Sequence, residues 1–327
     1  MGLFLALIML AVKCDSKTCK LQNYNLLDLT VSGLSSGAYF AVQFHVAHSR
    51  IVNASAIFAG GPFYCAESNL EYATQKCMAT TLPMDTQTLI AFTHTQASLG
   101  LIDSPQNMSG DRVYLFSGKD DTVVSPSVMH SLQSYYLAFV DANNLVADYN
   151  VPAEHCMPTL DYGEDCSTLA SPYLGKCNFD AAGAAFKYIY PQLNLERSAP
   201  IDANLFSFDQ TPFFSSSSAS IGDLGYIYVP MSCQSGQTPC HLHVSFHGCE
   251  QNIELVGSAY AQHSGYNAWA EKNNIIVLYP YVKVSTVYPY NPKGCWDWWS
   301  YTGMDYGVQT GVQMRFVRDI IASLGMH

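Results

Sequence analysis

Charged residues are scarce in this chain, and basic residues are the scarcest. Only 13% of its 327 residues are charged, with 15 Lys or Arg against 26 Asp or Glu, which gives a formal net charge of −11 at pH 7. Nucleic-acid binding depends on clusters of basic residues that contact phosphates, and the sequence contains no such cluster. We therefore expect no nucleic-acid partner. Hydrophobic residues make up 49% of the chain, enough for an ordered globular core.

The sequence also lacks an apolar run long enough to cross a bilayer, which takes about 20 residues. The run at 2–12 is shorter and is typical of a secretory signal peptide cleaved near Cys14 to Ser16, although no Lys or Arg precedes it. We predict a signal peptide over residues 1–16 and a secreted protein with no membrane span in the mature chain. Delivery to a lysosome or vacuole is the alternative destination. A buried N-terminal strand is the alternative interpretation of the run.

No internal repeat and no long linker divides the chain. The serine run at 215–218 is too short to separate two domains, so we predict a single domain over residues 17–327 and a monomer. Short apolar segments alternate with amphipathic ones, which predicts an α/β fold with a mostly parallel central sheet and helices on both faces. The expected strands cover 25–32, 54–60, 112–116, 147–151, 204–208, 225–229, 242–246 and 274–279, and the expected helices cover 38–47, 85–99, 127–140, 260–272 and 308–324.

Cysteine, in contrast, is abundant. The chain has 11 cysteines, and loss of Cys14 with the signal peptide would leave an even number, as suits an oxidised secreted domain. Proximity in the sequence suggests three local disulfides, a fourth would close a longer loop, and elimination suggests a fifth, but the connectivity stays a hypothesis. The pairs are Cys65–Cys77, Cys166–Cys177, Cys233–Cys240, Cys249–Cys295 and, by elimination, Cys19–Cys156. Asn53 and Asn107 begin Asn-x-Ser triplets and are candidate glycosylation sites.

The most informative motif is Gly-Leu-Ser-Ser-Gly at 33–37. It lies between an apolar segment predicted to be a strand and one predicted to be a helix. A Gly-x-Ser-x-Gly in that position is the nucleophile elbow of serine hydrolases, in which a tight turn presents the serine hydroxyl at a helix N-terminus. The pattern alone occurs by chance in many proteins. With the strand and helix around it, it predicts Ser35 as a nucleophile.

A serine nucleophile needs a histidine to accept its proton and a carboxylate to orient that histidine. In α/β-hydrolases the acid and then the histidine follow on loops after later strands. Asp120 and Asp121 come after the strand at 112–116, and the Gly-x-x-Asp-x-x-Val spacing favours Asp121, whereas Asp120 would cap the following helix. His155 follows the next predicted strand. Considered alone it would be a surface histidine, but its place after Ser35 and Asp121 makes it the predicted base.

Other reactive residues show no comparable pattern. His241 and His243 lie on one face of a predicted strand, as a metal-binding pair would, but no Cys, Asp or Glu ligand accompanies them at a recognisable spacing. We predict structural histidines, no metal and no cofactor. A Cys–His hydrolase built on Cys156 or Cys249 is disfavoured because an oxidising compartment would convert these thiols to disulfides.

The oxyanion of ester hydrolysis needs two N–H donors, and the amide after the nucleophile, here that of Ser36, supplies one. The second usually comes from a His-Gly loop upstream of the serine, whereas this chain has Phe-His-Gly-Cys at 246–249, downstream of the whole triad. The hairpin at 204–229 and the strand at 274–279 also look like segments that ordinarily precede the elbow. We therefore predict a circularly permuted α/β-hydrolase in which residues 200–327 supply the strands that normally come first.

Four segments occur together in this chain: Gly-Leu-Ser-Ser-Gly-Ala-Tyr at 33–39, Phe-Ala-Gly-Gly-Pro at 58–62, His-Gly-Cys at 247–249 and Asn-Pro-Lys-Gly-Cys-Trp-Asp-Trp at 291–298. They resemble the secreted poly(3-hydroxybutyrate) depolymerases, in particular the single-domain, circularly permuted group known from fungi. The resemblance runs from residue 25 to the C-terminus. It implies a triad of Ser35, Asp121 and His155, an oxyanion hole made by the amides of Ser36 and Cys249, and Trp296 in the wall of the substrate cleft.

The resemblance implies a serine esterase that hydrolyses poly(3-hydroxybutyrate) or its oligomers through an acyl-enzyme. The chain departs from the family pattern at Glu154 and Cys156, which flank His155 where small or uncharged residues are expected. A serine carboxylesterase acting on small or plant-derived esters, such as feruloyl or acetyl esters, would use the same machinery and is the first alternative. A non-catalytic binding protein of this fold is the second. It would have lost a triad residue, and this chain retains all three.

Overall fold

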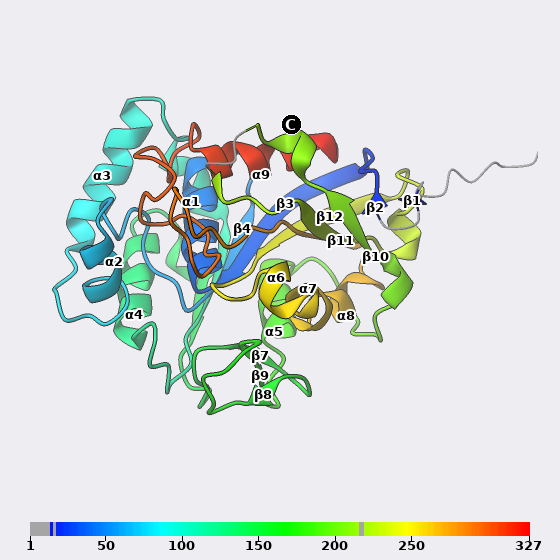
Figure 1. The fold of residues 1–327 in the computed structure, drawn as a ribbon, viewed down its shortest axis with the longest axis horizontal. Coiled ribbons are helices and arrows are strands. Elements are labelled where there is room, and N and C mark those ends of the chain that lie inside the picture. Colours follow the sequence, from blue (N-terminus) through cyan, green and yellow to red (C-terminus); the bar gives the residue numbers. More distant parts are fainter. Residues whose placement is uncertain (1–13, 16–17, 216–218) are drawn as a thin grey trace, which may run out of the picture.

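The structure, a computed structural model, describes residues 14–15, 18–215 and 219–327 (Figure 1). The predicted signal peptide over 1–16 lies outside the described residues except for 14–15, so it stays a prediction. In the part of the chain that the structure describes, no helix has the length and apolar character needed to cross a membrane.

One large sheet forms the centre of the described molecule (Figure 1). Its strands lie in the order β1-β2-β10-β11-β13-β12-β3-β4-β5-β6. Their bounds are β1 Cys14–Asp15, β2 Thr18–Cys19, β3 Asn25–Leu34, β4 Ala54–Phe58, β5 Arg112–Phe116, β6 Leu145–Asp148, β10 Leu205–Asp209, β11 Leu224–Tyr228, β12 Pro239–Phe246 and β13 Ile275–Tyr279. The strands from β13 to β6 are all parallel, while β11 and β10 add an antiparallel hairpin. The predicted, mostly parallel sheet is confirmed.

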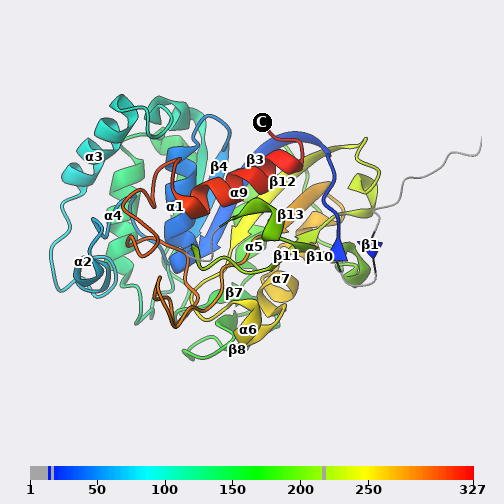
Figure 2. The same ribbon diagram turned by 45° about the horizontal axis from the view of Figure 1, so that its top comes forward.

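Helices cover both faces of this sheet (Figure 2). Their bounds are α1 Ser36–Ala47, α2 Leu70–Gln75, α3 Thr86–Ser98, α4 Pro126–Tyr136, α5 Ala181–Ile189, α6 Ile253–Val256, α7 Ala259–His263, α8 Asn267–Ala270 and α9 Val312–Ser323. One hydrophobic cluster joins α1 and α9 to the sheet through residues such as Phe40 and Phe316. A second joins α5 and α8 to the opposite face through Phe186 and Trp269.

The central strand β13 is apolar on both sides. In β13, Ile276 and Leu278 belong to the cluster of α1 and α9, whereas Ile275 and Val277 belong to the opposite cluster. Side chains alternate along a strand, so both faces of β13 bury apolar side chains against helices. That is why the run Ile-Ile-Val-Leu-Tyr predicts a buried strand correctly.

The C-terminal strands lie beside the N-terminal ones. β12 pairs in parallel with β3, with Val244 opposite Val31. The backbone N–H of Tyr24 donates to the carbonyl of Leu324 at 2.9 Å, so the segment entering β3 and the end of α9 are neighbours. Adjacent ends are what a circular permutation requires. Together with the strand order, they confirm the predicted permuted α/β-hydrolase fold.

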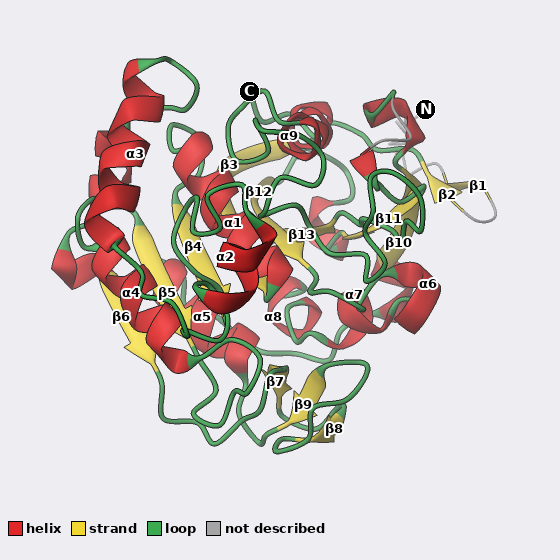
Figure 3. Cartoon of the chain, turned by 60° about the vertical axis from the view of Figure 1, so that its left-hand side comes forward, coloured by secondary structure: helices red, strands yellow, loops and turns green. Residues whose placement is uncertain are grey.

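A small second sheet lies apart from the main one (Figure 3). It consists of β7 Met157–Thr159, β9 Leu174–Lys176 and β8 Glu164–Asp165. The strand β7 begins two residues after His155, and the Cys166–Cys177 disulfide crosslinks the segment. This sheet therefore anchors one end of the loop that carries the predicted base.

The structure contains four of the five predicted disulfides, namely Cys65–Cys77, Cys166–Cys177, Cys233–Cys240 and Cys249–Cys295. The fifth, Cys19–Cys156, is wrong: Cys156 is a buried free thiol, and Cys19 is bonded to another cysteine. The elimination assumed that Cys14 is absent, whereas β1 places Cys14 opposite Cys19 in the strand register. A count of cysteines carries no geometry, so elimination could not identify the partner of Cys19.

One predicted helix is also wrong as a single element. The segment 260–272 contains two short helices, α7 and α8, separated at Gly265, whose φ of +99° lies outside the helical region. Glycine reaches such a φ without a Cβ clash, so it ends the first helix there.

Asn53 and Asn107, the candidate glycosylation sites, are both exposed. Their glycosylation stays a prediction.

Candidate active site

Ser35 occupies a strained turn between β3 and α1. Its backbone has φ +56° and ψ −123°, a conformation that side-chain-bearing residues rarely adopt. Gly33 and Gly37 make the turn sterically feasible. A Cβ on Gly33 would lie 2.2 Å from the carbonyl oxygen of Gly37, and a Cβ on Gly37 would lie 2.3 Å from that of Phe246. Both glycines of the Gly-x-Ser-x-Gly pattern are therefore needed because neighbouring backbone leaves no room for a Cβ, as in a nucleophile elbow.

The predicted acid and base are in direct contact. His155 Nδ1 lies 2.8 Å from Asp121 Oδ2, and both residues are buried. Asp121 Oδ1 accepts hydrogen bonds from the backbone N–H groups of Val123 and Val124 at 2.9 and 2.8 Å. In this contact Nδ1 of the ring donates to the carboxylate, which makes Nε2 the ring nitrogen available as an acceptor, as the predicted base requires. Asp120, in contrast, is exposed.

Ser35 and His155 both line a cavity of about 200 Å³. The same cavity is bordered by Gly248 and Cys249, from the His-Gly-Cys segment after β12. The elbow after β3, the histidine loop after β6 and this segment after β12 thus meet at the carboxyl ends of parallel strands of one sheet. Ligand sites of open α/β sheets form at this edge.

The His-Gly-Cys segment lies directly beside Ser35. A Cβ on Gly248 would lie 3.3 Å from Ser35 Cβ. His247 Nδ1 lies 2.7 Å from the carbonyl oxygen of Gly248, and its Nε2 accepts from the N–H of Val282 at 3.3 Å. Nδ1 therefore carries the proton and donates it to Gly248. In a trans peptide the next N–H points the opposite way, so His247 fixes the direction of the Cys249 amide.

Burial lowers the pKa of His247 to about 4. The ring is therefore neutral above pH 5, and its contact with Gly248 is the same across the neutral range.

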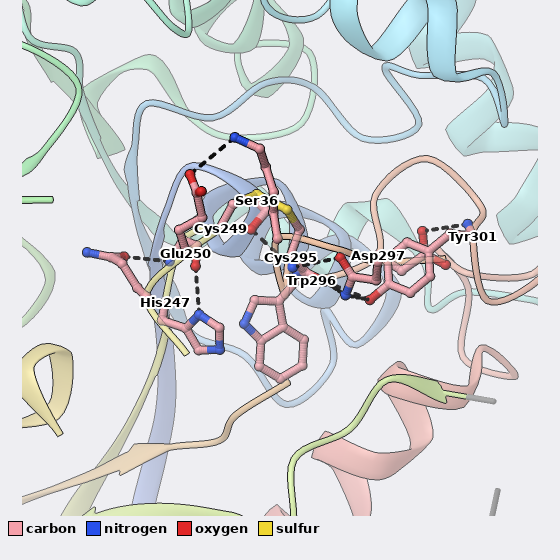
Figure 4. The surroundings of a disulfide bond; sticks show 12 residues. Ser36, His247, Cys249, Glu250, Cys295, Trp296, Asp297 and Tyr301 are labelled. Atoms are coloured by element: carbon pink, nitrogen blue, oxygen red, sulfur yellow. Dashed lines mark hydrogen bonds and ion pairs between the residues drawn. A yellow bond between two sulfur atoms is a disulfide. The ribbon is translucent and has the colours of Figure 1, made fainter. Parts of the chain in front are cut away.

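The disulfide Cys249–Cys295 joins the His-Gly-Cys segment to residues 296–302, which follow Cys295 and are called the aromatic loop below (Figure 4). The N–H of Trp296 donates to Ser36 Oγ at 3.3 Å, so the aromatic loop is also attached to the elbow.

A second, more apolar cavity of about 360 Å³ is also lined by Ser35. It shares Ser35, Met78, Cys249 and Lys293 with the first cavity. Its remaining wall is mostly aromatic and aliphatic, and includes Tyr39, Leu70, Tyr290, Trp298 and Trp299. Two cavities of different polarity therefore meet at the predicted nucleophile.

The expectation that Trp296 lines the cleft is corrected by the structure. Trp296 is completely buried, with its ring centroid 4.5 Å from that of Phe40 and 5.1 Å from that of Phe246. Trp298 and Trp299 form the cavity wall instead, and Trp298 stacks on Tyr39 at 4.0 Å. Sequence reasoning missed these two because successive side chains of an irregular loop follow no period that assigns them to a face.

Asp297 holds this aromatic loop in shape. Its carboxylate accepts backbone hydrogen bonds from Trp299, Ser300, Tyr301 and Thr302, at 2.7–3.2 Å. Burial raises the pKa of Asp297 to about 6. The aromatic wall of the larger cavity therefore depends on one buried carboxyl group.

The raised pKa of Asp297 gives a testable pH dependence of stability. Because the folded protein binds this proton more tightly than the unfolded chain, its contribution to stability is largest below about pH 4 and is lost as the pH rises through about 6. A shift from 3.8 to about 6 corresponds to about 3 kcal/mol. Urea unfolding at several pH values should therefore show a smaller pH dependence across this window in Asp297→Asn than in the parent. Equal pH dependences in the two proteins would contradict the assignment.

The other histidines singled out in the sequence have structural contacts. His243 is buried between Thr30 and Ser32, with its Nδ1 and Nε2 each 2.7 Å from a hydroxyl. His241 Nδ1 lies 2.9 Å from Asp28. Among the described residues, no group of three or more Cys, His, Asp or Glu is arranged to hold a metal ion.

A strained serine at a strand–helix turn, sharing a cavity with a histidine that is held by an aspartate, assigns the chain to the α/β-hydrolase serine hydrolases. Comparisons with known proteins narrow this class. No family model matches the chain. A poly(3-hydroxybutyrate) depolymerase of Delftia acidovorans is 43% identical over 89% of this chain, and a polyhydroxybutyrate depolymerase of Talaromyces funiculosus is 37% identical over 90% of this chain and 88% of its own length. The chain belongs to the poly(3-hydroxybutyrate) depolymerase family.

Solved structures agree with this assignment. The crystal structure of the PHB depolymerase from Penicillium funiculosum superimposes with a TM-score of 0.85 and 35% identity, over 93% of this chain and 98% of that one. A serine-to-alanine variant of a PHB depolymerase, complexed with an R3HB trimer, gives the same TM-score at 34% identity and the same coverage. The chain spans only 58% of the length of the Delftia relative.

Proposed function

We propose that this protein is a secreted serine esterase that hydrolyses poly(3-hydroxybutyrate) or its oligomers. The meeting of two cavities at Ser35 supports this proposal. An enzyme that cuts a chain of ester-linked units must hold a unit on each side of the scissile bond. The units are uncharged and carry methyl groups, and the larger, mostly apolar cavity suits them. A relative of this family has been crystallised with an R3HB trimer.

The proposed reaction uses only side chains and amides already described. Ser35 Oγ attacks the ester carbonyl carbon while His155 Nε2 takes the hydroxyl proton, and Asp121 stabilises the imidazolium that forms. The amides of Ser36 and Cys249 donate to the oxyanion. His155 then gives its proton to the leaving alcohol as the C–O bond breaks, which leaves the acyl group on Ser35. Water then attacks the acyl carbonyl carbon while His155 takes one of its protons. The bond between that carbon and Ser35 Oγ breaks, His155 returns the proton to Oγ, and the acid is released.

Secretion and a monomeric state belong to the same proposal. Four disulfides suit an oxidising compartment. Size-exclusion chromatography with light scattering would test the monomer, and N-terminal sequencing of the protein from the culture medium would test the signal peptide.

The proposal requires contact with a solid substrate, and exposed apolar side chains near the larger cavity suit such contact. Val287 and Tyr288 are 72% and 85% exposed, and they stand shortly before Tyr290 in the sequence, where the segment that lines this cavity begins. Loss of both apolar contacts, at about 1.5 kcal/mol or more, is expected to slow clearing of a polymer suspension by about tenfold. The double variant Val287→Ser/Tyr288→Ser should therefore clear the suspension slowly while hydrolysing a soluble aryl ester at the parental rate.

The control for this prediction is Leu99→Ser, which removes a 64% exposed leucine at the end of α3. It should clear the suspension like the parent. Equal clearing by the double variant and the parent would show that these side chains do not contact the polymer.

The function as a whole is tested by comparing two substrates. The parent protein should clear a poly(3-hydroxybutyrate) suspension and also hydrolyse soluble aryl esters. Turnover of aryl esters without clearing would instead support a carboxylesterase of small or plant-derived esters. Absence of both activities, with no labelling by a fluorophosphonate, would support a binding protein of this fold.

A further inference from the structure

Glu154 is a buried carboxylate next to His155 in the sequence, and the proposed reaction does not use it. Its relative exposure is 6%. None of the ion pairs found among the described residues includes it. Burial of a carboxylate without a cation is costly unless hydrogen-bond donors surround it.

Donors from two loops surround Glu154. The backbone N–H of Thr122 lies 3.1 and 3.0 Å from Oε1 and Oε2, and the Thr122 hydroxyl donates to Oε1. The backbone N–H of His155 lies 3.1 Å from Oε2. Thr122 follows Asp121 directly, so the carboxylate of Glu154 connects the residue next to the proposed acid with the proposed base itself.

The two loops also touch through their backbones. A Cβ on Gly118 would lie 2.2 Å from the carbonyl oxygen of Ala153, and the N–H of Asp120 donates to the same oxygen at 3.1 Å. These contacts attach the two loops to each other on the N-terminal side of Asp121. The hydrogen bonds of Glu154 with Thr122 attach them on its C-terminal side, so Asp121 lies between two points of attachment.

We propose that Glu154 is a positioning residue that holds the Asp121 loop against His155 and so maintains the 2.8 Å contact between the acid and the base. This inference rests on the proposed triad. A carboxylate suits the role because it only accepts hydrogen bonds. A glutamine in its place would direct amide hydrogens at the N–H groups of Thr122 or His155. The chemistry of the donors therefore explains why a charged residue stands here, where the family resemblance leads us to expect a small or uncharged one.

The first test compares kcat and KM of Glu154→Ala, Glu154→Gln and the parent on a soluble aryl ester at 25 °C. A small misplacement of catalytic groups costs about 100-fold, so Glu154→Ala should lower kcat by about 10- to 100-fold and leave KM within about twofold. Glu154→Gln keeps one acceptor oxygen and should lose less. The matched control is Glu164→Ala, which removes the same charge from an exposed position on β8 and should keep the parental kcat. Circular dichroism and thermal unfolding establish that each variant is folded.

The second test is a double-mutant cycle with Asp121→Asn, which separates positioning from a general effect on folding. In the Asp121→Asn background the acid–base contact is already impaired, so adding Glu154→Ala should lower kcat by less than about threefold. A merely structural role would give the same fold-loss in both backgrounds, and that result would overturn the proposal. So would a Glu154→Ala kcat within about twofold of the parent.

Failure of the triad gives a different pattern. If His155→Ala keeps the parental kcat, the proposed catalytic residues are wrong and the role of Glu154 falls with them. If His155→Ala is inactive while Glu154→Ala is fully active, the triad stands and only the positioning role is overturned.

Discussion

Ser35→Ala should lower kcat for a soluble ester by about 10⁶-fold, the loss typical of removing a nucleophile that acts as part of a triad. The variant should stay folded because alanine retains the Cβ, and the backbone strain at φ +56° is the same for both residues. Binding of oligomers should survive, because both cavities remain. Ester turnover together with fluorophosphonate labelling would measure the effect.

The control for the nucleophile is Ser134→Ala, which alters an exposed serine on α4. It should be labelled and active like the parent. Labelling of Ser35→Ala at the parental level would mean that another residue is the nucleophile, and the elbow would then be a structural turn without a catalytic role.

Asp121→Asn should lower kcat by about 10⁴-fold, because an amide in place of the carboxylate favours the wrong tautomer of the histidine. The neighbouring Asp120→Asn should have less than a twofold effect, since Asp120 is exposed and its N–H, which the substitution retains, makes the contact with Ala153. The two variants differ by one position in the sequence. Their comparison therefore tests the Gly-x-x-Asp-x-x-Val assignment directly.

Steady-state kinetics on one aryl ester, with matched protein concentrations, measures both substitutions. Equal losses in Asp120→Asn and Asp121→Asn would indicate that the loop itself, rather than the carboxylate of Asp121, supports the reaction. A large loss in Asp120→Asn alone would reverse the assignment.

The sequence predicts the sheet and the elbow well because both follow from local patterns. β13 is a continuous apolar run, and the two glycines around Ser35 are needed for contacts within a few residues or with the adjacent strand. The downstream position of the His-Gly-Cys segment predicts the permutation, since β12 then lies next to β3.

The residues that line the cleft and the partner of Cys19 could not be predicted, because both depend on where side chains point in the folded protein. Three tryptophans stand within four positions, yet Trp296 packs in the core and Trp298 and Trp299 line the cavity. The pairing of Cys19 with Cys156 followed from a count of cysteines, and a count contains no geometry. The contacts of Glu154 with Thr122 join residues 32 positions apart, and no spacing rule indicates such a bond.

The hydrogen bond between Tyr24 and Leu324 has a consequence for protein engineering. A short peptide could fuse the two ends, and new ends could be opened in the exposed stretch before β10, around Arg197. Such a rearranged gene would encode the hairpin and β12 ahead of the elbow, in the conventional hydrolase order. Since the strands from β10 to β6 would keep their order in the sheet, the refolded product should keep the parent's catalytic rate.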